Sequence, residues 1–286
     1  MSDRVADRFL DRHPELLDED GHSPSVRRRV AQLVAPLALW HRFRCSGLEH
    51  VPDGACLLVA NHSAGAIVEV LLVLRAWTER HPERPARGLA HQVAFQRPFK
   101  WAPVSRLGAI LAHPEVARRS LARGDALLVF PGGDLEASRS FADRYRVTLG
   151  GRTGFARLAR EAGVPIVPLV ICGSHAPYVV LPGGEAFARV TGLARLFGLK
   201  SFPLTIGAVT SLASAALALV NPFAWPLVGL AIAAAAVPLP SRIEAEALPP
   251  IHPIAGESDE ALGERVRVAM QQAMDRMAAG RSSPWT

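Results

Sequence analysis

Residues 55–74 read ACLLVANHSAGAIVEVLLVL, and this stretch predicts how the chain is built. The apolar run up to Ala60 is typical of a buried strand, the small residues after it form a turn, and the apolar-rich run from Ala66 predicts a helix. A strand followed directly by a helix is the repeating unit of α/β proteins. The turn between two such elements is also a common place for reactive side chains.

One histidine and one glutamate stand out in this turn and helix. His62 can act as a general base at neutral pH, because the ordinary pKa of histidine is about 6.5. Glu69 is the only acidic residue among the nine that follow His62. From the first helical turn its carboxylate can bend back and hold the imidazole in one tautomer. The alternative is that His62 caps the helix and Glu69 is solvated, and this segment alone does not decide between the two.

The strand-and-helix pattern continues along the chain. Predicted strands at 88–95, 126–130 and 166–172 alternate with predicted helices at 115–123 and 151–162. This alternation predicts an α/β fold with a central sheet flanked by helices. We divide the chain into N-terminal helices at 1–44 and a domain at 45–286, which carries an apolar insertion at 202–240 and a closing helix at 257–277.

A second candidate site follows the predicted strand at 126–130, where residues 131–136 read PGGDLE. The two glycines let the backbone approach a ligand closely and point N–H groups at an anion or a developing oxyanion. Pro-Gly-Gly is also common in plain turns, so its weight comes from its position after a second strand. Guanidinium groups, which suit phosphate oxygens, follow at Arg139, Arg144 and Arg146.

The composition favours a lipid surface over nucleic acid. Lys and Arg number 32 against 26 Asp and Glu, the sequence pI is near 10.0, and 49% of the 286 residues are hydrophobic. A basic and apolar chain suits an anionic membrane, whereas the aromatic and basic interleaving of a base-stacking surface is not evident. The dispersed Cys45, Cys56 and Cys172 predict free thiols, and we expect no metal site. The acidic N-terminus does not read as a secretory signal, so we expect a cytoplasmic location.

Residues 201–241 contain no charged side chain. Apolar limbs at 204–220 and 227–237 flank a helix-breaking Asn221-Pro222, which predicts a helical hairpin. A membrane crossing needs about 20 apolar residues, so the second limb is too short to span, and we expect the hairpin to dip into the bilayer and leave by the same face. A hairpin buried in the core is the alternative. A basic, tryptophan-bearing helix at 26–43 suits the membrane interface or the protein surface equally well.

Taken in order, these motifs resemble those of the PlsC-like glycerolipid acyltransferases. The resemblance covers residues 45–252 and is to the branch with a Pro-Gly-Gly-Asp-x-Glu block, which is related to acylglycerol acyltransferases. The segment at 61–62 resembles the first family block, 130–136 the third, and 164–168 the fourth, a strand that lines the acyl-donor pocket. The resemblance implies the mixed sheet of that family and an O-acyltransferase activity.

The resemblance also implies roles for single residues. His62 is the expected catalytic base and Glu69 its orienting acid, although most family members carry an aspartate five residues after the histidine, where this chain has Ile67. No bound cofactor is expected, because the co-substrate is acyl-CoA or an acylated carrier protein, whose phosphates the arginines would bind. The expected substrate contacts are Asn61, Ser63, Gly132, Gly133, Asp134, Glu136, Arg139, Arg144, Arg146 and Pro165.

The implied acceptor is a hydroxyl group of a glycerolipid, such as lysophosphatidate or a mono- or diacylglycerol. Ala112 and His113 stand where the second block usually ends in a phosphate-binding arginine, and Gly132 stands where phosphate-acceptor enzymes carry glutamate, which favours a neutral acceptor. We expect a peripheral or monotopic protein at the cytoplasmic face of the cell membrane. Two alternatives stay open: a non-catalytic lipid-binding protein of the same fold, and a lipid hydrolase that uses Ser63, although no Gly-x-Ser-x-Gly motif occurs.

Overall fold

The computed structural model describes residues 3–17, 21–95, 104–192, 200–201, 203–283 and 285. Within these residues a seven-stranded sheet has the order β1-β7-β6-β2-β5-β3-β4. β7 runs antiparallel to β6, and the other neighbouring pairs are parallel, which confirms the predicted α/β fold with a mixed central sheet. The strands are β1 (Arg44–Ser46), β2 (Cys56–Ala60), β3 (Ala86–Ala90), β4 (Ala109–Leu111), β5 (Ala126–Val129), β6 (Ile166–Cys172) and β7 (Glu244–Ala247).

The middle of the sheet is formed by strands that are apolar along their whole length. Every residue of β2 and β6 is buried, because helices cover both faces of the sheet. Strands in that position read as continuous apolar runs, which is why the sequence reveals them. β1 and β4 have only three residues each, and β7 alternates glutamate with alanine, so these strands toward the sheet edges were not predicted.

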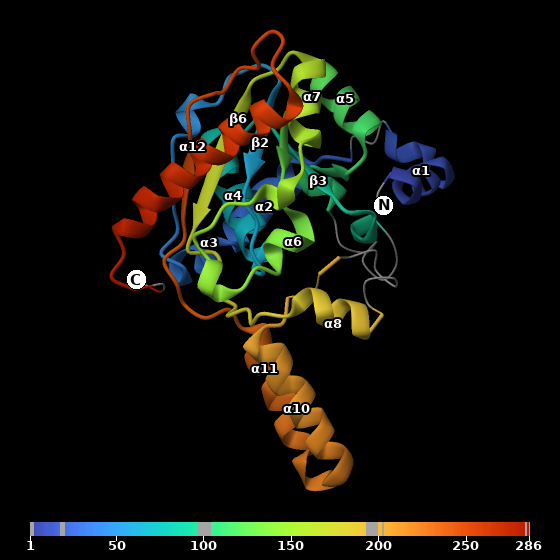
Figure 1. Ribbon diagram of the computed structural model, residues 1–286, viewed down its shortest axis with the longest axis vertical. Helices are drawn as coiled ribbons and strands as arrows, with labels where there is room; N and C mark the ends of the chain where they lie inside the picture. The colour runs from blue at the N-terminus through green and yellow to red at the C-terminus, as the bar shows by residue number, and fades with distance from the viewer. Residues whose placement is uncertain are drawn as a thin grey trace.

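Two layers of helices enclose the sheet (Figure 1). Leu57 and Leu58 of β2 point to opposite faces, because successive side chains alternate along a strand. Leu58 packs into the layer of α2 (Pro24–Leu33), α3 (Ala35–Trp40) and α4 (Ala66–Arg80). Leu57 packs into the layer of α5 (Pro114–Ala122), α7 (Gly154–Ala162) and α12 (Asp259–Ala279), with α1 (Asp3–Arg12) at its periphery.

Three predicted elements have different bounds in the structure. The strand predicted at 88–95 is wrong in its second half, because Gln92–Phe95 forms a 3-10 turn after β3. The helix predicted from residue 151 begins at Gly154, since Gly150 and Gly151 adopt left-handed φ angles of 62° and 63°. The single helix predicted at 26–43 is divided into α2 and α3, with Pro36 in the first turn of α3.

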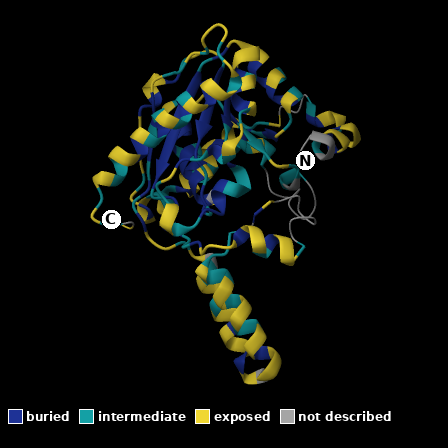
Figure 2. Cartoon of the chain, in the orientation of Figure 1, coloured by how far each residue is buried: buried dark blue, intermediate teal, exposed yellow. Residues whose placement is uncertain are grey.

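The apolar insertion forms two helices, α10 (Ile206–Val220) and α11 (Trp225–Ala236), that project together from the body of the molecule (Figure 1). Most of their surface is exposed (Figure 2). Leu219 of α10 is 80% exposed, and Phe223, in the turn between the two helices, is 93% exposed. This exposure contradicts the alternative of a hairpin buried in the core. Among the described residues, no helix has both the length and the apolar character needed to cross a membrane. The dip into a bilayer stays a prediction.

The root of the hairpin is attached beside the segment that leaves β6. Ile206 N–H donates to Val179 O at 3.0 Å, and Leu239 N–H donates to Pro177 O at 3.1 Å. Both limbs therefore contact residues 177–179, which follow the carboxyl end of β6 by a few positions. The short helix α8 (Gly184–Val190) lies between this segment and the hairpin in the chain.

Candidate active site

The carboxyl ends of β2, β5 and β6 lie side by side, because β2 pairs in parallel with both of the others. Ser63, after β2, donates its hydroxyl to Ser174 O, after β6, at 3.0 Å. His62 N–H, also after β2, donates to Oε2 of Glu136 at 3.0 Å. Glu136 belongs to α6 (Gly133–Ala137), which follows β5. The fold therefore brings the two predicted sites, around His62 and around Gly132, into one place.

His62 and Glu69 are in direct contact, as the sequence predicted. Nδ1 of His62 hydrogen-bonds Oε1 of Glu69, and Ser63 Oγ donates to Oε2 at 2.8 Å. Because α4 begins at Ala66, Glu69 lies in its first turn and its side chain points back toward the helix N-terminus. The Glu69 side chain is 0% exposed and that of His62 is 16% exposed. The carboxylate accepts the Nδ1–H, which leaves the lone pair on Nε2 of the ring.

The surroundings of His62 favour its protonated form. Burial lowers the pKa of the ring, but the charge of Glu69, with further contributions from Glu136 and Asp134, outweighs burial and raises the pKa of His62 above 6.5. The ring of Phe130 packs against the imidazole with the centroids 4.7 Å apart. An imidazolium formed when the ring accepts a proton is therefore stabilised, which is what a general base requires.

The glycines of the Pro-Gly-Gly motif are required by close packing. A Cβ on Gly132 would lie 2.2 Å from Oε2 of Glu136, whose side chain folds back over the turn. Gly133 has a φ of +49°, and a Cβ there would lie 2.7 Å from Nη1 of Arg152. The Gly133 N–H already donates to Phe130 O at 3.1 Å. Of the two amides predicted to bind an oxyanion, only that of Gly132 has no acceptor within the described part of the chain.

Glu136 is placed inside the protein. It is 1% exposed, and its carboxylate accepts the N–H groups of Thr148 at 3.1 Å and Leu149 at 3.3 Å in addition to that of His62. Nη1 of Arg139 completes the set at 3.1 Å. Its oxygens therefore bond three backbone amides and one guanidinium, and its predicted substrate contact stays a prediction.

Arg139 is also placed inside the protein. It is 9% exposed, and besides Glu136 it donates through Nη2 to Nε2 of His175 at 2.6 Å. The guanidinium of Arg139 bonds protein groups of the site, and its predicted phosphate contact stays a prediction. His175 was not singled out from the sequence as part of this site. Its signal is positional: it lies three residues after β6, and the end of β6 adjoins the end of β2.

His175 is held neutral beside the His62 segment. Burial, followed by the nearby charge of Arg139, lowers the pKa of His175 well below its ordinary value. Because Arg139 donates to Nε2, the proton of the neutral ring is on Nδ1. The site therefore contains two histidines of opposite character, one whose protonation is favoured and one whose protonation is disfavoured.

The other two arginines remain near the surface. Arg144 lies over the rings of Phe141 at 4.6 Å and Tyr145 at 4.8 Å, and its Nη1 donates to Phe141 O at 2.9 Å. Arg146 is exposed. Their predicted role in binding phosphate stays a prediction.

Asn61 and Ser63 are fully buried and hold the backbone around His62. The Asn61 side-chain amide donates to Ile171 O at 2.9 Å and accepts from Ile171 N–H at 2.8 Å, which extends the pairing of β2 with β6. The hydroxyl group of Ser63 lies within hydrogen-bond distance of two acceptors, Oε2 of Glu69 and Ser174 O, which share its one proton. In the structure both side chains bond protein groups, and their predicted contact with substrate stays a prediction.

Asp134 joins the glycine turn to the hairpin root. Its Oδ1 accepts from Nη2 of Arg152 at 3.1 Å, and its Oδ2 accepts the N–H groups of Lys200 and of Ser201, the latter at 3.2 Å. These two residues come shortly before α10. Both oxygens of Asp134 have protein donors, and its predicted contact with substrate stays a prediction.

Pro165 lies at the opposite end of the paired strands β2 and β6 from His62. β2 and β6 are parallel, and Leu57 is level with Ile166, so Pro165 is level with the start of β2 while His62 follows its end. At about 3.3 Å per residue, the two are roughly 20 Å apart along the strand direction. It is the carboxyl end of β6 that adjoins His62, and the predicted substrate contact of Pro165 stays a prediction.

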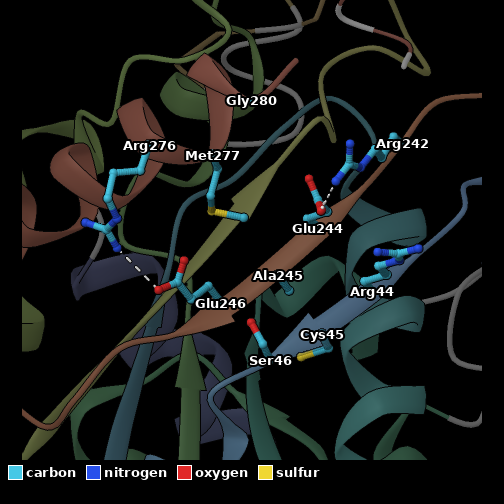
Figure 3. Close-up of a pocket in the computed structure, with 10 residues that line it drawn as sticks. All are labelled: Arg44, Cys45, Ser46, Arg242, Glu244, Ala245, Glu246, Arg276, Met277 and Gly280. Atoms are coloured by element: carbon cyan, nitrogen blue, oxygen red, sulfur yellow. Dashed lines mark hydrogen bonds and ion pairs between the residues drawn. The ribbon is translucent and has the colours of Figure 1, made fainter. Parts of the chain in front are cut away.

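The structure has a separate open pocket of ≈ 630 Å³ on the β1–β7 edge (Figure 3). It is lined by β1, β7 and the end of α12, and its charges are largely paired: Arg242 with Glu244 at 2.7 Å and Arg276 with Glu246 at 3.3 Å. None of the predicted site residues lines it. In the part of the chain that the structure describes, no group of three or more His, Cys, Asp or Glu side chains could hold a metal ion.

The chain is similar to a known protein family and to several known proteins. The family model described as "Acyltransferase" matches residues 42–172, which contain both glycine-flanked turns of the site. An uncharacterized protein of Mycobacterium tuberculosis is 34% identical over 277 residues, covering 93% of this chain and 70% of the relative. The "DGAT1/2-independent enzyme synthesizing storage lipids" of Gallus gallus is 30% identical over 183 residues, covering 62% of this chain and 54% of that enzyme.

A solved structure has the same fold. The crystal structure of the 1-acyl-sn-glycerophosphate acyltransferase PlsC from Thermotoga maritima superimposes with a TM-score of 0.53. The match covers 89% of this chain and 81% of that chain at 16% sequence identity. At this identity the similarity establishes the shared architecture alone.

Proposed function

The chain belongs to the acyltransferase family and is an acyltransferase, and we propose that it transfers a fatty acyl group from an acyl thioester to a hydroxyl group of a glycerolipid. The observation that carries this proposal is the His62–Glu69 pair. A fully buried carboxylate binds Nδ1 of an imidazole whose ring is partly exposed beside a glycine turn. This arrangement suits general-base catalysis on a hydroxyl group that approaches Nε2.

In the proposed reaction, Nε2 of His62 takes the proton of the acceptor hydroxyl as its oxygen attacks the thioester carbonyl. The imidazolium that forms is stabilised by Glu69, which also keeps the ring in one orientation. The tetrahedral intermediate then releases the thiolate, which leaves as the thiol after taking the proton from His62. The Gly132 N–H is the amide available to stabilise the oxyanion, because that of Gly133 is already bonded to Phe130 O.

The geometry gives no support to a serine hydrolase mechanism. Ser63, the serine next to His62, is fully buried, and its hydroxyl donates to Glu69 at 2.8 Å. A nucleophilic serine must instead be reachable by the substrate and bonded to the base. Direct transfer from donor to acceptor, without an acyl-enzyme, is therefore the reaction that we propose.

A neutral acylglycerol is the acceptor that we favour. Ala112 and His113 stand where a phosphate-binding arginine is expected, and Nε2 of His113 is bonded to Oδ1 of Asp7 at 2.9 Å. The relatives named as enzymes that synthesise storage lipids point in the same direction. The structural neighbour named as a lysophosphatidate acyltransferase supports the second candidate, an acceptor with a phosphate group. Acyl-CoA and an acylated carrier protein remain the two candidate donors.

We also propose that the enzyme works at a membrane surface, with the α10–α11 hairpin inserted in the lipid. No charged residue occurs between Ser201 and Ser241, and Leu219 and Phe223 near the tip are 80% and 93% exposed. Exposing each large apolar side chain to water costs about 1.5 to 3 kcal/mol relative to burial. Trp40 of α3 is 48% exposed and donates its Nε1–H to Pro238 O, shortly after α11, at 2.8 Å, and tryptophan is enriched at membrane interfaces.

The experiment that tests the reaction is an acceptor panel. Purified protein is incubated with radiolabelled palmitoyl-CoA, or with palmitoyl carrier protein, and with lysophosphatidate, monoacylglycerol or diacylglycerol in detergent micelles. We expect acylated product with a monoacyl- or diacylglycerol from the wild type and none from His62→Ala. Product only with lysophosphatidate would overturn the neutral acceptor, and binding of lipid without any turnover would overturn the proposed reaction.

The membrane proposal has its own test and control. Leu219→Glu/Phe223→Glu places two charges at the hairpin tip, and Ile254→Glu places one on the body at a residue that is 59% exposed. We expect the tip variant to lose sedimentation with phosphatidylglycerol–phosphatidylcholine vesicles and the body variant to keep it. Equal sedimentation of the tip variant and the wild type would rule out insertion of the hairpin.

A further inference from the structure

Glu136 connects three segments of the site that are far apart in the sequence. Its Oε2 accepts the His62 N–H from a residue 74 positions away, and its Oε1 accepts amides from the loop at 148–149. The side chain also covers Gly132 so closely that no larger residue fits there. This carboxylate therefore helps to hold the His62 main chain, together with the contacts of Asn61 and Ser63.

The loop that Glu136 binds has an unfavourable backbone conformation. Leu149 has a φ of +48°, which is uncommon for a residue with a branched side chain, and it is only 3% exposed. A Cβ on the neighbouring Gly150 would lie 3.1 Å from Gly132. Such a conformation persists when the surrounding structure holds it, and here the carboxylate of Glu136 accepts the amides of both Thr148 and Leu149. Glu136 thus holds the glycine turn from two sides.

The buried charges of the site do not balance when His62 is neutral. Glu69 and Glu136 each have side chains that are 0% exposed, and Arg139, with a side chain 7% exposed, is the cation bonded to Glu136. Among the described residues, Asp134 also acts on His62, but it is paired with Arg152 and its side chain is 14% exposed. His175 faces His62 as a neutral ring. The buried set therefore has one negative charge in excess, and it becomes neutral when His62 accepts a proton.

We propose that the Glu136–Arg139 ion pair is a positioning device for His62, which fixes its main chain and sets the buried charge that its ring meets. The proposal rests on the proposed role of His62 as the base. Neither member touches substrate: Glu136 acts through the His62 N–H, and Arg139 acts by cancelling the second carboxylate. Without Arg139 the ring would face two uncompensated carboxylates, and without Glu136 it would face one carboxylate and one uncompensated guanidinium.

This charge arrangement predicts shifts of opposite sign in single variants. Glu136→Gln removes a negative charge and lowers the pKa of His62, whereas Arg139→Met removes a positive charge and raises it, each by about one pH unit. Glu136→Gln/Arg139→Met removes both charges, so the pKa of His62 returns toward the wild-type value. A purely structural role of the pair would change stability without this ordered shift.

The pKa of His62 is measured by NMR titration of ¹³C-labelled histidine in the full chain, with the His62 signal assigned through His62→Gln. This readout needs no substrate, so a failure of the proposed reaction and a failure of the positioning proposal give different results. The matched control is Arg160→Met. Arg160 is paired with Asp259 at 2.9 Å, and its side chain is 36% exposed. We expect no shift in that control.

The same variants are then assayed for acyl transfer from palmitoyl-CoA to monoacylglycerol across pH. We expect kcat to fall at least tenfold in Glu136→Gln with an unchanged KM, and the acid limb of the profile to move to lower pH. If circular dichroism shows that a single variant does not fold, the double variant is compared with Arg160→Met instead. We then expect the double variant to have a lowered kcat and an acid limb at the wild-type pH. A raised KM with unchanged kcat, or single-variant shifts of the same sign, would overturn the proposal.

Discussion

The turn after β2 and the turn after β5 are built alike and use a glutamate differently. Each ends a buried strand, contains a glycine and opens a helix from which a fully buried glutamate points back at the turn. Glu69 binds the side chain of His62 and of Ser63, both within seven residues of it. Glu136 binds main-chain amides from two distant segments together with an arginine.

The difference shows how the same residue type can serve chemistry or geometry. Within the described residues no guanidinium is bonded to Glu69, so its charge is available to stabilise a proton on His62. The charge of Glu136 is largely cancelled by Arg139 at 3.1 Å, and its oxygens fix where the backbone lies. Replacing residues of the first turn should therefore act mainly through the charge that meets His62, whereas replacing residues of the second turn should also disturb the packing.

The largest expected effect is in the first turn. His62→Ala removes the proposed base, and we expect acyl transfer to fall roughly a thousandfold, within the range typical of general-base catalysis. The thermal unfolding midpoint should stay close to that of the wild type, because the ring is at the edge of the site and 16% exposed. The measurement is turnover under saturating donor. A rate within tenfold of the wild type would remove His62 from the mechanism.

Glu69→Gln tests whether the charge of the first turn matters. We expect the rate to fall roughly a hundredfold, because the amide keeps the shape but no longer stabilises the imidazolium. His62 must be neutral to act as a base, and Glu69 raises its pKa, so wild-type activity should rise with pH along a limb above pH 6.5. In Glu69→Gln that limb should move to lower pH. A limb that stays in place would show that the carboxylate does not act on His62.

Gly132→Ala tests the packing of the second turn. The added Cβ would meet Oε2 of Glu136 at 2.2 Å, so the side chain must move away from the His62 N–H. We expect unfolding to become easier by about 1 to 3 kcal/mol, as for other overpacked sites, with activity reduced about tenfold. Gly54→Ala is the matched control, since a Cβ there meets nothing within 4 Å. Denaturant unfolding of both variants decides, and equal midpoints would argue against the packing.

The smallest effect is expected from Ser63→Ala. The hydroxyl donates to Glu69 at 2.8 Å, and losing one such hydrogen bond typically costs about 1 kcal/mol. We expect activity to fall about threefold, with the protein still able to transfer acyl groups, because Ser63 is not the nucleophile. Loss of all activity, or trapping of an acyl group on Ser63 in mass spectra of the wild type, would instead support the hydrolase alternative.

Much of this site was predictable where the contacts are local. His62 and Glu69 are seven residues apart, and a helix that begins at Ala66 places the second next to the first. β2, β5 and β6 were predicted because strands buried on both faces are apolar throughout. The short β1 and the alternating β7 do not have that signal, and their place in the sheet depends on pairing with distant strands.

The sequence does not decide which polar residues contact substrate, for a physical reason. Asn61, Glu136 and Arg139 are polar residues next to the site motifs, and polarity alone does not distinguish a side chain that meets a ligand from one that bonds a buried backbone. Pro165 directly precedes β6, and only the parallel register of β6 with β2 places it at the end of these strands opposite to His62.

The sequence by itself determined the strand–turn–helix units, the His62–Glu69 pair and the uncharged hairpin, because each depends on residues within a few turns of one another. The tertiary structure alone decided that Glu136 and Arg139 face inward, that His175 joins the site and that Asp134 holds the hairpin root. These contacts join residues as far as 74 positions apart, and burial away from water is what makes each polar group take a partner from another segment.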